Sequence, residues 1–332
     1  MDFKGKKVLV TGAGGFIASH LVENLIQKDA KVTAFIRKTS MANIGMLSEI
    51  SSEKLNEINI TFGDLRNPEL IKKIIFDNEI EIIYHLGAMI SIPDSYAVPR
   101  DYIETNIGGT LNILEAGKLG IEKILITSTS EVYGTALYTP INESHPLNPQ
   151  SPYAASKVGA DKIAESFYKS FGLPVSIVRP FNTFGPRQSQ RAVIPTVIIQ
   201  ALTQEKIKLG SLSTQRDFNY VQDTVNGFIR IAEYGKFEGE VTNICSGRTV
   251  SIEEVVKKVG EIIKKDTLSM VEPDELRLRP KKSEVQLLLG DYSKAKEEVG
   301  WEPQFSFEEG LEKTICYIKK NIKKYNPEKY AK

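Results

Sequence analysis

The sequence predicts an α/β protein with a doubly wound parallel sheet and a smaller mixed α/β lobe toward the C-terminus. Short apolar segments alternate with amphipathic, helix-like segments from the first residues onward. The apolar segments are continuous rather than alternating, which indicates strands that are buried on both faces. A glycine-rich turn follows the first of them. Together these observations indicate a parallel sheet that is covered by helices on both sides.

The first half of the chain is a regular series of predicted strands and helices. Lys7–Thr11 is the first strand, and Phe16–Gln27 carries apolar residues at helical spacing. Further strands are predicted at 31–36, 58–61, 80–85, Lys123–Thr127 and 174–178. Helices are predicted between them at Pro68–Asp77, 102–118 and 153–171. Residues 1–180 are therefore expected to form one domain around this sheet.

After Arg179 the regular alternation stops. Proline, glycine, arginine and glutamine cluster in 179–191, and a helix is predicted at 194–204. Residues 218–221, the helix after Asp223 and a strand at Val241–Ile244 predict a return to the first lobe at about 217–246. Helices near 251–265 and 307–324 then belong to a second lobe, so residues 181–332 are expected to form mainly that lobe.

Composition and charge exclude several classes of protein. The chain has 332 residues, 41% hydrophobic and 26% charged, which is typical of a soluble globular protein and too apolar for disorder. A formal net charge of +1 gives no overall field for nucleic acid or an anionic membrane. No apolar run approaches a membrane span, and the N-terminal MDFKGKKVLV leads directly into a strand pattern, so neither a membrane anchor nor a signal peptide is expected. Cys245, Cys316 and three scattered histidines offer no disulfide framework and no metal site, and the expected compartment is a reducing cytoplasm.

Residues 11–18 read TGAGGFIA, between the first predicted strand and the first predicted helix. Gly12 permits the tight turn, and Gly14 and Gly15 let backbone N–H groups approach a pyrophosphate at the helix N-terminus. The spacing is G-x-x-G-x-x-A, with Ala18 as the small residue that keeps the helix close to the sheet. A structural turn without a ligand is the alternative, but the position on the first βα unit favours a dinucleotide. The predicted cofactor contacts of this loop are Gly12, Gly14, Gly15, Phe16 and Ile17.

The end of the second predicted strand distinguishes NAD from NADP. An acid there would bind the ribose 2′-hydroxyl, but residues 37–40 read Arg-Lys-Thr-Ser, which favours the 2′-phosphate of NADP. NAD is the alternative cofactor, and an exposed basic loop is the alternative without a ligand. The predicted contacts are Arg37, Lys38 and Ser40, with Asp64 as the candidate partner of adenine. The other predicted cofactor contacts are Leu65, Leu86, Gly87, Ala88 and Thr127.

Tyr153 and Lys157 are the candidate acid–base pair. They are one helical turn apart, and an ammonium close to a phenol favours tyrosinate, a plausible base at a substrate hydroxyl. The same spacing occurs twice more near the C-terminus, at Tyr292/Lys296 and Tyr325/Lys329. We favour Tyr153 and Lys157 over the other two pairs because their helix follows the hydroxyl-rich strand end at 127–131. Active sites in open α/β sheets lie beyond the carboxyl ends of the strands. With a Ser or Thr beside it, the pair suits an alcohol oxidation by a nicotinamide cofactor.

These motifs together resemble the extended short-chain dehydrogenase/reductase family. They are TGAGGFIA at 11–18, TSTSEVYG at 127–134, YAASK at 153–157 and RPFN with GPR at 179–187. The resemblance covers nearly the whole chain and implies a Rossmann-like domain, action on a nucleotide-diphosphate sugar and a homodimer. Members of the family act as epimerases, dehydratases, decarboxylases or reductases. One departure is Ala18, where the family usually has glycine, and we expect cofactor binding to survive it.

Glu131 directs the choice of subfamily. The triplet Thr129-Ser130-Glu131 resembles the Thr-(Asp or Ser)-Glu triplet of nucleotide-sugar 4,6-dehydratases, in the form found in GDP-mannose 4,6-dehydratases. The segments 151–157, 187–195 and 278–285 look more like the N-acetylglucosamine dehydratases of legionaminic acid biosynthesis. The nucleotide and the sugar therefore stay open, with UDP- or GDP-N-acetylglucosamine expected first. A structural carboxylate that caps the Glu-Val-Tyr-Gly turn is the alternative reading of Glu131.

The resemblance implies a role for each candidate side chain. Tyr153, held by Lys157 and Thr129, takes the proton of the sugar C4 hydroxyl, and Glu131 then removes the acidified C5 proton while Ser130 assists loss of water from C6. The cofactor ends as it began. The implied substrate-binding residues are Asn182, Arg216 and Arg279, with Arg187 and Arg191 less specifically indicated; the alternative for each arginine is an ordinary surface charge.

Two rival functions remain open at this point. A nucleotide-sugar 4-epimerase uses the same oxidation but does not need Glu131. A catalytically silent protein that senses the dinucleotide would keep the fold, but it would be expected to lose Tyr153, Lys157 or the Thr129 hydroxyl, and all three are intact.

Overall fold

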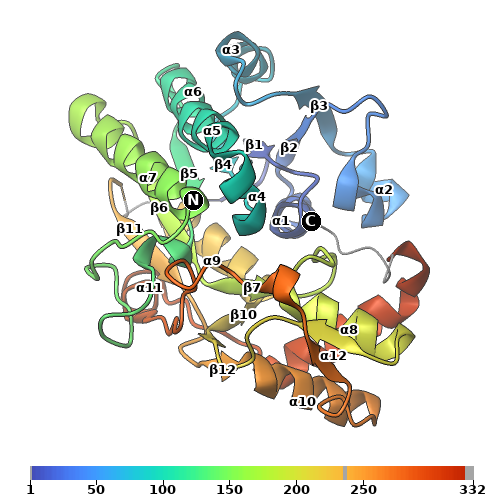
Figure 1. The fold of residues 1–332 in the computed structure, drawn as a ribbon. Coiled ribbons are helices and arrows are strands. Elements are labelled where there is room, and N and C mark those ends of the chain that lie inside the picture. Colours follow the sequence, from blue (N-terminus) through green and yellow to red (C-terminus); the bar gives the residue numbers. More distant parts are fainter. Residues whose placement is uncertain (1, 235–237, 326–332) are drawn as a thin grey trace.

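The structure is a computed structural model that describes residues 2–234 and 238–325. Its centre is a sheet of seven parallel strands in the order β11-β6-β5-β4-β1-β2-β3 (Figure 1). The strands are β1 (Lys7–Thr11), β2 (Lys31–Arg37), β3 (Asn59–Gly63), β4 (Ile82–His85), β5 (Lys123–Thr127), β6 (Val175–Pro180) and β11 (Val241–Ile244). The order reverses between β1 and β4, and the carboxyl ends of these neighbours form the edge at which such sheets bind ligands.

The predicted burial on both faces of the sheet is confirmed. Along β1, Val8 and Val10 belong to one apolar cluster and Leu9 to another on the opposite face. The first cluster lies under α1 (Phe16–Gln27) and α9 (Val221–Tyr234). The second lies under α3 (Pro68–Asp77), α6 (Gly109–Gly117) and α7 (Pro152–Phe171). Continuous apolar strands have therefore formed a doubly wound sheet, as the sequence predicts.

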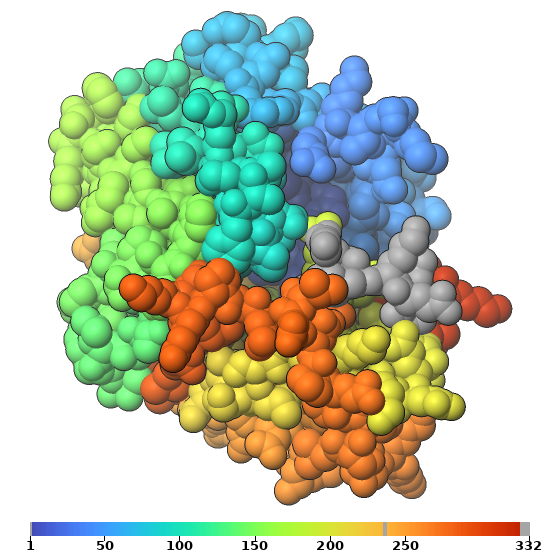
Figure 2. Space-filling model, in the orientation of Figure 1, coloured from blue at the N-terminus to red at the C-terminus, as the bar shows by residue number. Residues whose placement is uncertain are grey.

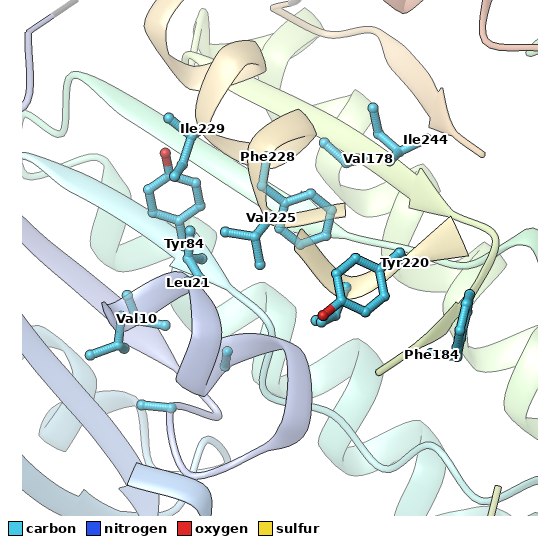
Figure 3. Close-up of a cluster of buried hydrophobic side chains, with 14 of the residues drawn as sticks. Val10, Leu21, Tyr84, Val178, Phe184, Tyr220, Val225, Phe228, Ile229 and Ile244 are labelled. Carbon is cyan, nitrogen blue, oxygen red and sulfur yellow. The ribbon is translucent and has the colours of Figure 1, made fainter. Parts of the chain in front are cut away.

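One of these clusters extends beyond the sheet. In Figure 3, Leu21 of α1 and Phe228 of α9 lie beside Val10 and Tyr84 of the strands. The same cluster continues through Phe184 to side chains of α8 (Val193–Thr203), α10 (Ile252–Ile263) and α12 (Phe307–Lys320). The two lobes therefore share one apolar core.

The smaller lobe contains three pairs of short strands. They are β7 (Asn182–Phe184) with β10 (Phe218–Tyr220), β8 (Ile207–Leu209) with β13 (Val271–Pro273), and β9 (Gln215–Arg216) with β12 (Val250–Ser251). The expectation that residues 218–221 rejoin the large sheet is wrong for the strand itself. β11 already pairs with β6 from Ile177 to Pro180, so β10 pairs with β7 instead, while α9 and β11 return to the sheet.

Other boundaries differ from the sequence prediction in detail. The predicted helix at 102–118 comprises the end of α5 (Pro99–Tyr102), a π-helical turn (η2, Ile103–Gly108) and α6. α7 begins where the Ser151 hydroxyl accepts a hydrogen bond from the Ala154 N–H, and it ends at Gly172, whose φ is +63°. The remaining elements are η1 (Gly45–Glu49), α2 (Ser52–Leu55), α4 (Ile92–Ala97), η3 (Ser130–Tyr133), η4 (Glu275–Arg277), α11 (Ser293–Val299) and η5 (Ile322–Lys324). Within the described residues, none of the helices has the length and apolar character to cross a bilayer.

Candidate active site

The glycine loop after β1 leaves the N-terminus of α1 open to an anion. Gly12 has φ +68°, and a Cβ there would lie 2.8 Å from the Cα of Gly87. The N–H of Gly15 bonds to the Gly12 carbonyl, which closes the turn. The first turn of α1 has neither a capping side chain nor an acidic residue. Backbone donors and the helix dipole therefore fit the pyrophosphate of a dinucleotide.

Segment 86–88 after β4 is held against this loop by a chain of hydrogen bonds. The Gly87 N–H donates to Thr11 Oγ1, and Thr11 in turn contacts His85 Nδ1 at 2.8 Å. The Thr110 hydroxyl donates to a carbonyl, so His85 Nε2 carries the proton that reaches Thr110 at 3.2 Å. Burial lowers the pKa of His85 to about 3, with the Lys157 charge acting in the same direction. A neutral histidine of one tautomer thus positions Gly87 beside Gly12.

Asn106 holds the next residues of this segment against α7. Its side-chain amide pairs with both backbone groups of Met89, and it also donates to Ser156 Oγ at 2.9 Å. Ser156 donates to the carbonyl of Tyr153. The π-helical turn places Asn106 between the two segments.

The predicted contacts at the end of β2 lie on the surface. Arg37, Lys38 and Ser40 are exposed, and neither cation has a side-chain hydrogen bond or ion pair with the described residues. Asp64 is paired with Arg66 at 2.7 Å, and that hydrogen bond lowers the pKa of Asp64. Leu65 lies deeper, where a Cβ at Gly87 would meet it at 2.7 Å. Figure 2 shows the molecule hollowed between α4 (teal) and the segments after β2 (blue).

Tyr153 and Lys157 are both buried at the carboxyl end of β5. The Lys157 ammonium donates to the Thr127 carbonyl at 2.6 Å. Burial raises the pKa of Tyr153 above its usual range, while a hydrogen bond with Thr129 acts in the opposite direction. Burial also lowers the pKa of Lys157, and the nearby Asp161 carboxylate raises it. The Tyr102 ring packs edge-on against Tyr153, with ring centroids 6.3 Å apart.

The triplet Thr129-Ser130-Glu131 forms the start of η3, beside this pair. Thr129 Oγ1 accepts a hydrogen bond from the Glu131 N–H at 3.2 Å, and all three residues are buried. Glu131 Oε2 lies 3.6 Å from Arg279 Nη1. The local turn thus presents a carboxylate and two hydroxyls beside the Tyr153 phenol of α7.

A cavity of about 300 Å³ lies in the smaller lobe, with Pro93 of α4 also in its lining. Tyr153 and the triplet do not line it, but Arg279 both lines it and contacts Glu131. Asn182, Arg191, Arg216 and Arg279 line it, together with Glu284. Arg216 pairs with Glu284 at 3.3 Å, and Arg191 pairs with Asp94 at 3.2 Å. Arg279 Nη1 and Asn182 Oδ1 are buried without a hydrogen-bond partner among the described residues. In Figure 2 the segment that carries Arg279 (orange) lies against α4 (teal), where Ser283 contacts Tyr96 at 2.6 Å.

Arg187 is the one candidate that the structure places elsewhere. Its guanidinium pairs with Glu23 of α1 at 2.7 Å, and it does not line the cavity. Sequence reasoning also missed Glu284, Asp161 and Ser156. Of these, only Asp161 had a visible signal, because it continues the Tyr153 and Lys157 spacing by one more turn of the helix.

The comparisons with known proteins agree with the fold. The model of the family named GDP-mannose 4,6 dehydratase matches residues 9–314. A dTDP-D-glucose 4,6-dehydratase of Mus musculus is 31% identical over 96% of this chain and 90% of its own. A putative UDP-glucose 4-epimerase of Methanocaldococcus jannaschii is also 31% identical, over 95% of this chain and 99% of its own.

Two solved structures superimpose closely. The dTDP-glucose 4,6-dehydratase of Bacillus anthracis in complex with NAD has a TM-score of 0.86 and 30% identity, covering 98% of this chain and 100% of its own. The UDP-glucuronic acid 4-epimerase of Bacillus cereus, in complex with UDP-glucuronic acid and NAD, has a TM-score of 0.84 and 29% identity, covering 95% and 99%. This chain therefore belongs to the GDP-mannose 4,6 dehydratase family, among the NAD-dependent nucleotide-sugar dehydratases and epimerases of the short-chain dehydrogenase/reductase fold.

Proposed function

We propose that the protein is a nucleotide-sugar 4,6-dehydratase. The observation that carries this proposal is the buried Glu131 carboxylate, which shares one end of the sheet with Tyr153 and lies 3.6 Å from Arg279 of the cavity. An epimerization at C4 needs only one acid–base group at the C4 hydroxyl. An elimination across C5 and C6 needs a second one, and Glu131 supplies it.

The roles of the side chains follow from their positions. Tyr153, beside the Lys157 charge and the Thr129 hydroxyl, removes the proton of the sugar C4 hydroxyl. The nicotinamide cofactor, when bound, accepts a hydride from the sugar and later gives it back. The C4 ketone acidifies the C5 proton, which Glu131 removes and afterwards returns. Ser130 assists protonation of the departing C6 hydroxyl, directly or through a water. The proton that leaves with this hydroxyl is matched by the C4 hydroxyl proton that Tyr153 releases, so the net change is loss of one water from the sugar.

The cofactor contacts proposed are those predicted from the sequence, with NADP as the first candidate and NAD as the alternative. The glycine loop and segment 86–88 would hold the pyrophosphate and the nicotinamide half. Arg37 and Lys38 support NADP, because they are exposed cations and no acid takes their place at the end of β2. Arg37 lies near enough to Asp64 to help lower its pKa, but neither cation has a side-chain hydrogen bond with the described residues. NAD is supported by the relatives, since both solved structures above contain it.

The proposed substrate is UDP- or GDP-N-acetylglucosamine, held mainly by residues 181–332, while residues 1–180 hold the cofactor. Arg216, Arg279 and Asn182 line the cavity. Arg279 Nη1 is a donor without a hydrogen-bond partner among the described residues and suits a diphosphate, whereas Asn182 Oδ1 is an unpartnered acceptor and suits a hydroxyl of the nucleotide sugar. Arg191 would have to leave Asp94 to join them. Arg187, paired with Glu23, is better assigned to the contact between the small lobe and α1.

The test is to incubate the purified protein with each of these two sugar nucleotides and to weigh the product by mass spectrometry. Loss of the mass of one water, without net reduction of the cofactor, is the expected result. dTDP-glucose and GDP-mannose are the next substrates to try. An unchanged mass with a new chromatographic peak would instead establish a 4-epimerase, which the Methanocaldococcus relative favours.

We also propose that the protein forms a homodimer through η2, α6 and α7. Ile103 and Phe171 on these elements are 54% and 57% exposed, although both are large and apolar. The adjoining helices pack closely, since a Cβ at Gly159 of α7 would lie 2.6 Å from Ile107. Sedimentation analysis of the wild type and of Ile103→Glu tests this, and a wild-type monomer would contradict it.

A further inference from the structure

Asp161 lies one helical turn beyond Lys157 on the buried face of α7, two turns beyond Tyr153. Its carboxylate oxygen Oδ2 accepts three hydrogen bonds, from Arg179 Nη2 at 2.9 Å, from Arg179 Nε at 3.2 Å and from the Ser128 hydroxyl at 2.8 Å. Its other oxygen, Oδ1, is buried and has no hydrogen-bond partner among the described residues. The residue is completely shielded from solvent.

The hydrogen bonds of Asp161 favour its ionised form against the effect of burial. Burial raises its pKa, and Arg179 and Lys157 offset that rise only in part. A proton on Oδ1 would lack any acceptor in the described structure, whereas three donors converge on Oδ2. Asp161 is therefore a carboxylate that is ion-paired with Arg179, lies one helical turn from Lys157 and keeps one oxygen free to accept.

Few groups other than Asp161 stabilise the positive charge of Lys157. Lys157 is 3% exposed, and within residues 2–234 and 238–325 the one hydrogen bond of its ammonium runs to the Thr127 carbonyl, next to the Ser128 that bonds to Asp161. An ammonium in such a place is costly unless a negative group lies nearby. Asp161 is the nearby carboxylate that stabilises it.

The other groups around the pair do not replace this charge. His85 of β4 is neutral, as its lowered pKa requires, and Arg179 of β6 is itself a cation. Tyr133 of η3 is engaged by Arg179 and Asn243, and Tyr102 of α5 is a buried phenol. Glu131 lies toward the cavity, beside Arg279.

We propose that Asp161 is a positioning residue of the acid–base pair: its carboxylate keeps Lys157 protonated, so that the proton lost first by the pair is that of Tyr153. Lys157, Arg179 and Asp161 together carry one net positive charge, which a tyrosinate at Tyr153 balances. Without Asp161, the buried lysine loses its proton first and Tyr153 stays a neutral phenol, which is no base. Tyr153 and Lys157 titrate as a coupled unit. Loss of Asp161 therefore changes both the share of molecules that carry tyrosinate and the apparent pKa of the pair. The inference rests on the proposed function in one respect only, because the pH–rate profiles that test it need a reaction to measure.

The experiment compares pH–rate profiles of the wild type, Asp161→Asn and Asp161→Glu. In Asp161→Asn the acidic limb of kcat moves to lower pH, because a negative charge has been removed. The plateau of kcat falls about tenfold or more, because a change of one pKa unit in which of Tyr153 and Lys157 loses its proton first is a factor of ten. KM for the nucleotide sugar stays within about twofold, since Asp161 does not line the cavity. Asp161→Glu restores most of the plateau.

Ser128→Ala is the matched control. It removes one neutral hydrogen bond from the same Oδ2 atom but leaves the charge, so the acidic limb and the plateau stay as in the wild type. If Asp161→Asn does not fold because Arg179 is left unpaired, Asp161→Asn combined with Arg179→Met removes both buried partners and leaves Lys157 without its carboxylate.

A second measurement does not depend on turnover. The ultraviolet difference titration of tyrosinate, taken between each protein and the same protein with Tyr153→Phe, gives the ionised share of Tyr153 directly. That share, at the pH of the plateau, falls in Asp161→Asn. An unchanged tyrosinate share and an unchanged plateau, with only a lower melting temperature, would reduce Asp161 to a structural ion pair and overturn the proposal. If the wild type converts none of the nucleotide sugars, the proposed function fails while this titration still decides the role of Asp161.

Discussion

Arg279 Nη1 lies 3.6 Å from Glu131 Oε2, so a guanidinium that lines the cavity is in ionic contact with the carboxylate proposed to act at C5. The same nitrogen has no hydrogen-bond partner among the described residues. It is therefore positioned to receive a substrate oxygen while it still faces Glu131. The proposed diphosphate site and the proposed acid–base carboxylate thus share the side chain of Arg279.

Arg279→Gln should weaken binding of the nucleotide sugar by about 10- to 100-fold, since a hydrogen bond to a charged group contributes about 1.5–3 kcal/mol. Isothermal titration calorimetry of the holoenzyme with the diphosphate nucleotide measures this. Arg230→Gln, on α9 and outside the cavity, is the control and should bind normally. Equal affinities in all three proteins would exclude Arg279 from the binding site.

Glu131→Gln should lower the rate of water loss by about 10²- to 10⁴-fold, the usual contribution of a general acid–base group. Oxidation at C4 does not need Glu131, so reduced cofactor should accumulate in the variant and be visible in its absorbance. Glu115→Gln, exposed on α6, serves as the control. Undiminished conversion by Glu131→Gln would refute the dehydratase assignment and leave an epimerase.

Gly12→Ala should abolish cofactor binding and destabilise the fold. The added Cβ would lie 2.8 Å from the Cα of Gly87, and the φ of +68° disfavours any side chain. Gly172→Ala is a matched control, because its φ is +63° but nothing lies within 4 Å of the added Cβ. It should cost about 1 kcal/mol in stability and leave cofactor binding intact. Fluorescence titration with NADPH, beside urea unfolding, separates the two effects.

Arg37→Ala together with Lys38→Ala should reduce the affinity for NADP by about 10- to 100-fold and change that for NAD by less than about threefold. The reason is that the two cations are exposed and have no side-chain hydrogen bonds with the described residues, so both can reach a 2′-phosphate. Equilibrium binding of both dinucleotides to the wild type comes first. A wild type that prefers NAD would contradict the NADP proposal before any variant is made.

Stability should fall as the pH drops below 6.5, the ordinary pKa of histidine. The folded-state pKa of His85 is lowered to about 3, so between pH 6.5 and about 3 the unfolded chain binds a proton that the folded protein does not. The stability is present above pH 6.5 and decreases by about 1.4 kcal/mol per pH unit for this group. Urea unfolding from pH 7 to 4.5 measures the slope, and His85→Asn should show a slope smaller by one proton. An unchanged slope would mean that His85 is protonated in the folded protein.

Local signals in the sequence predicted most of the elements, but not the contacts between distant ones. β1, α1, α3, β5 and β11 have the predicted bounds because apolar periodicity and glycine turns are local properties. Arg187 and Arg279 are equally basic in the sequence, yet one pairs with α1 and the other lines the cavity, which depends on the path of the chain. Asp161 was missed because its partners Arg179 and Ser128 come from two other strands or strand ends. The pairing of β10 with β7 is equally non-local.

The shared apolar core has a consequence for how such proteins can be recombined. Side chains of α9 pack on the sheet, and the cluster they belong to continues into α8, α10 and α12. A cut at residue 180 would therefore expose apolar surface on both fragments, and neither would be expected to remain in solution alone. Exchanging substrate preferences between relatives would require grafting α9 together with the small lobe. In evolution, the two lobes are then expected to change as one inherited unit.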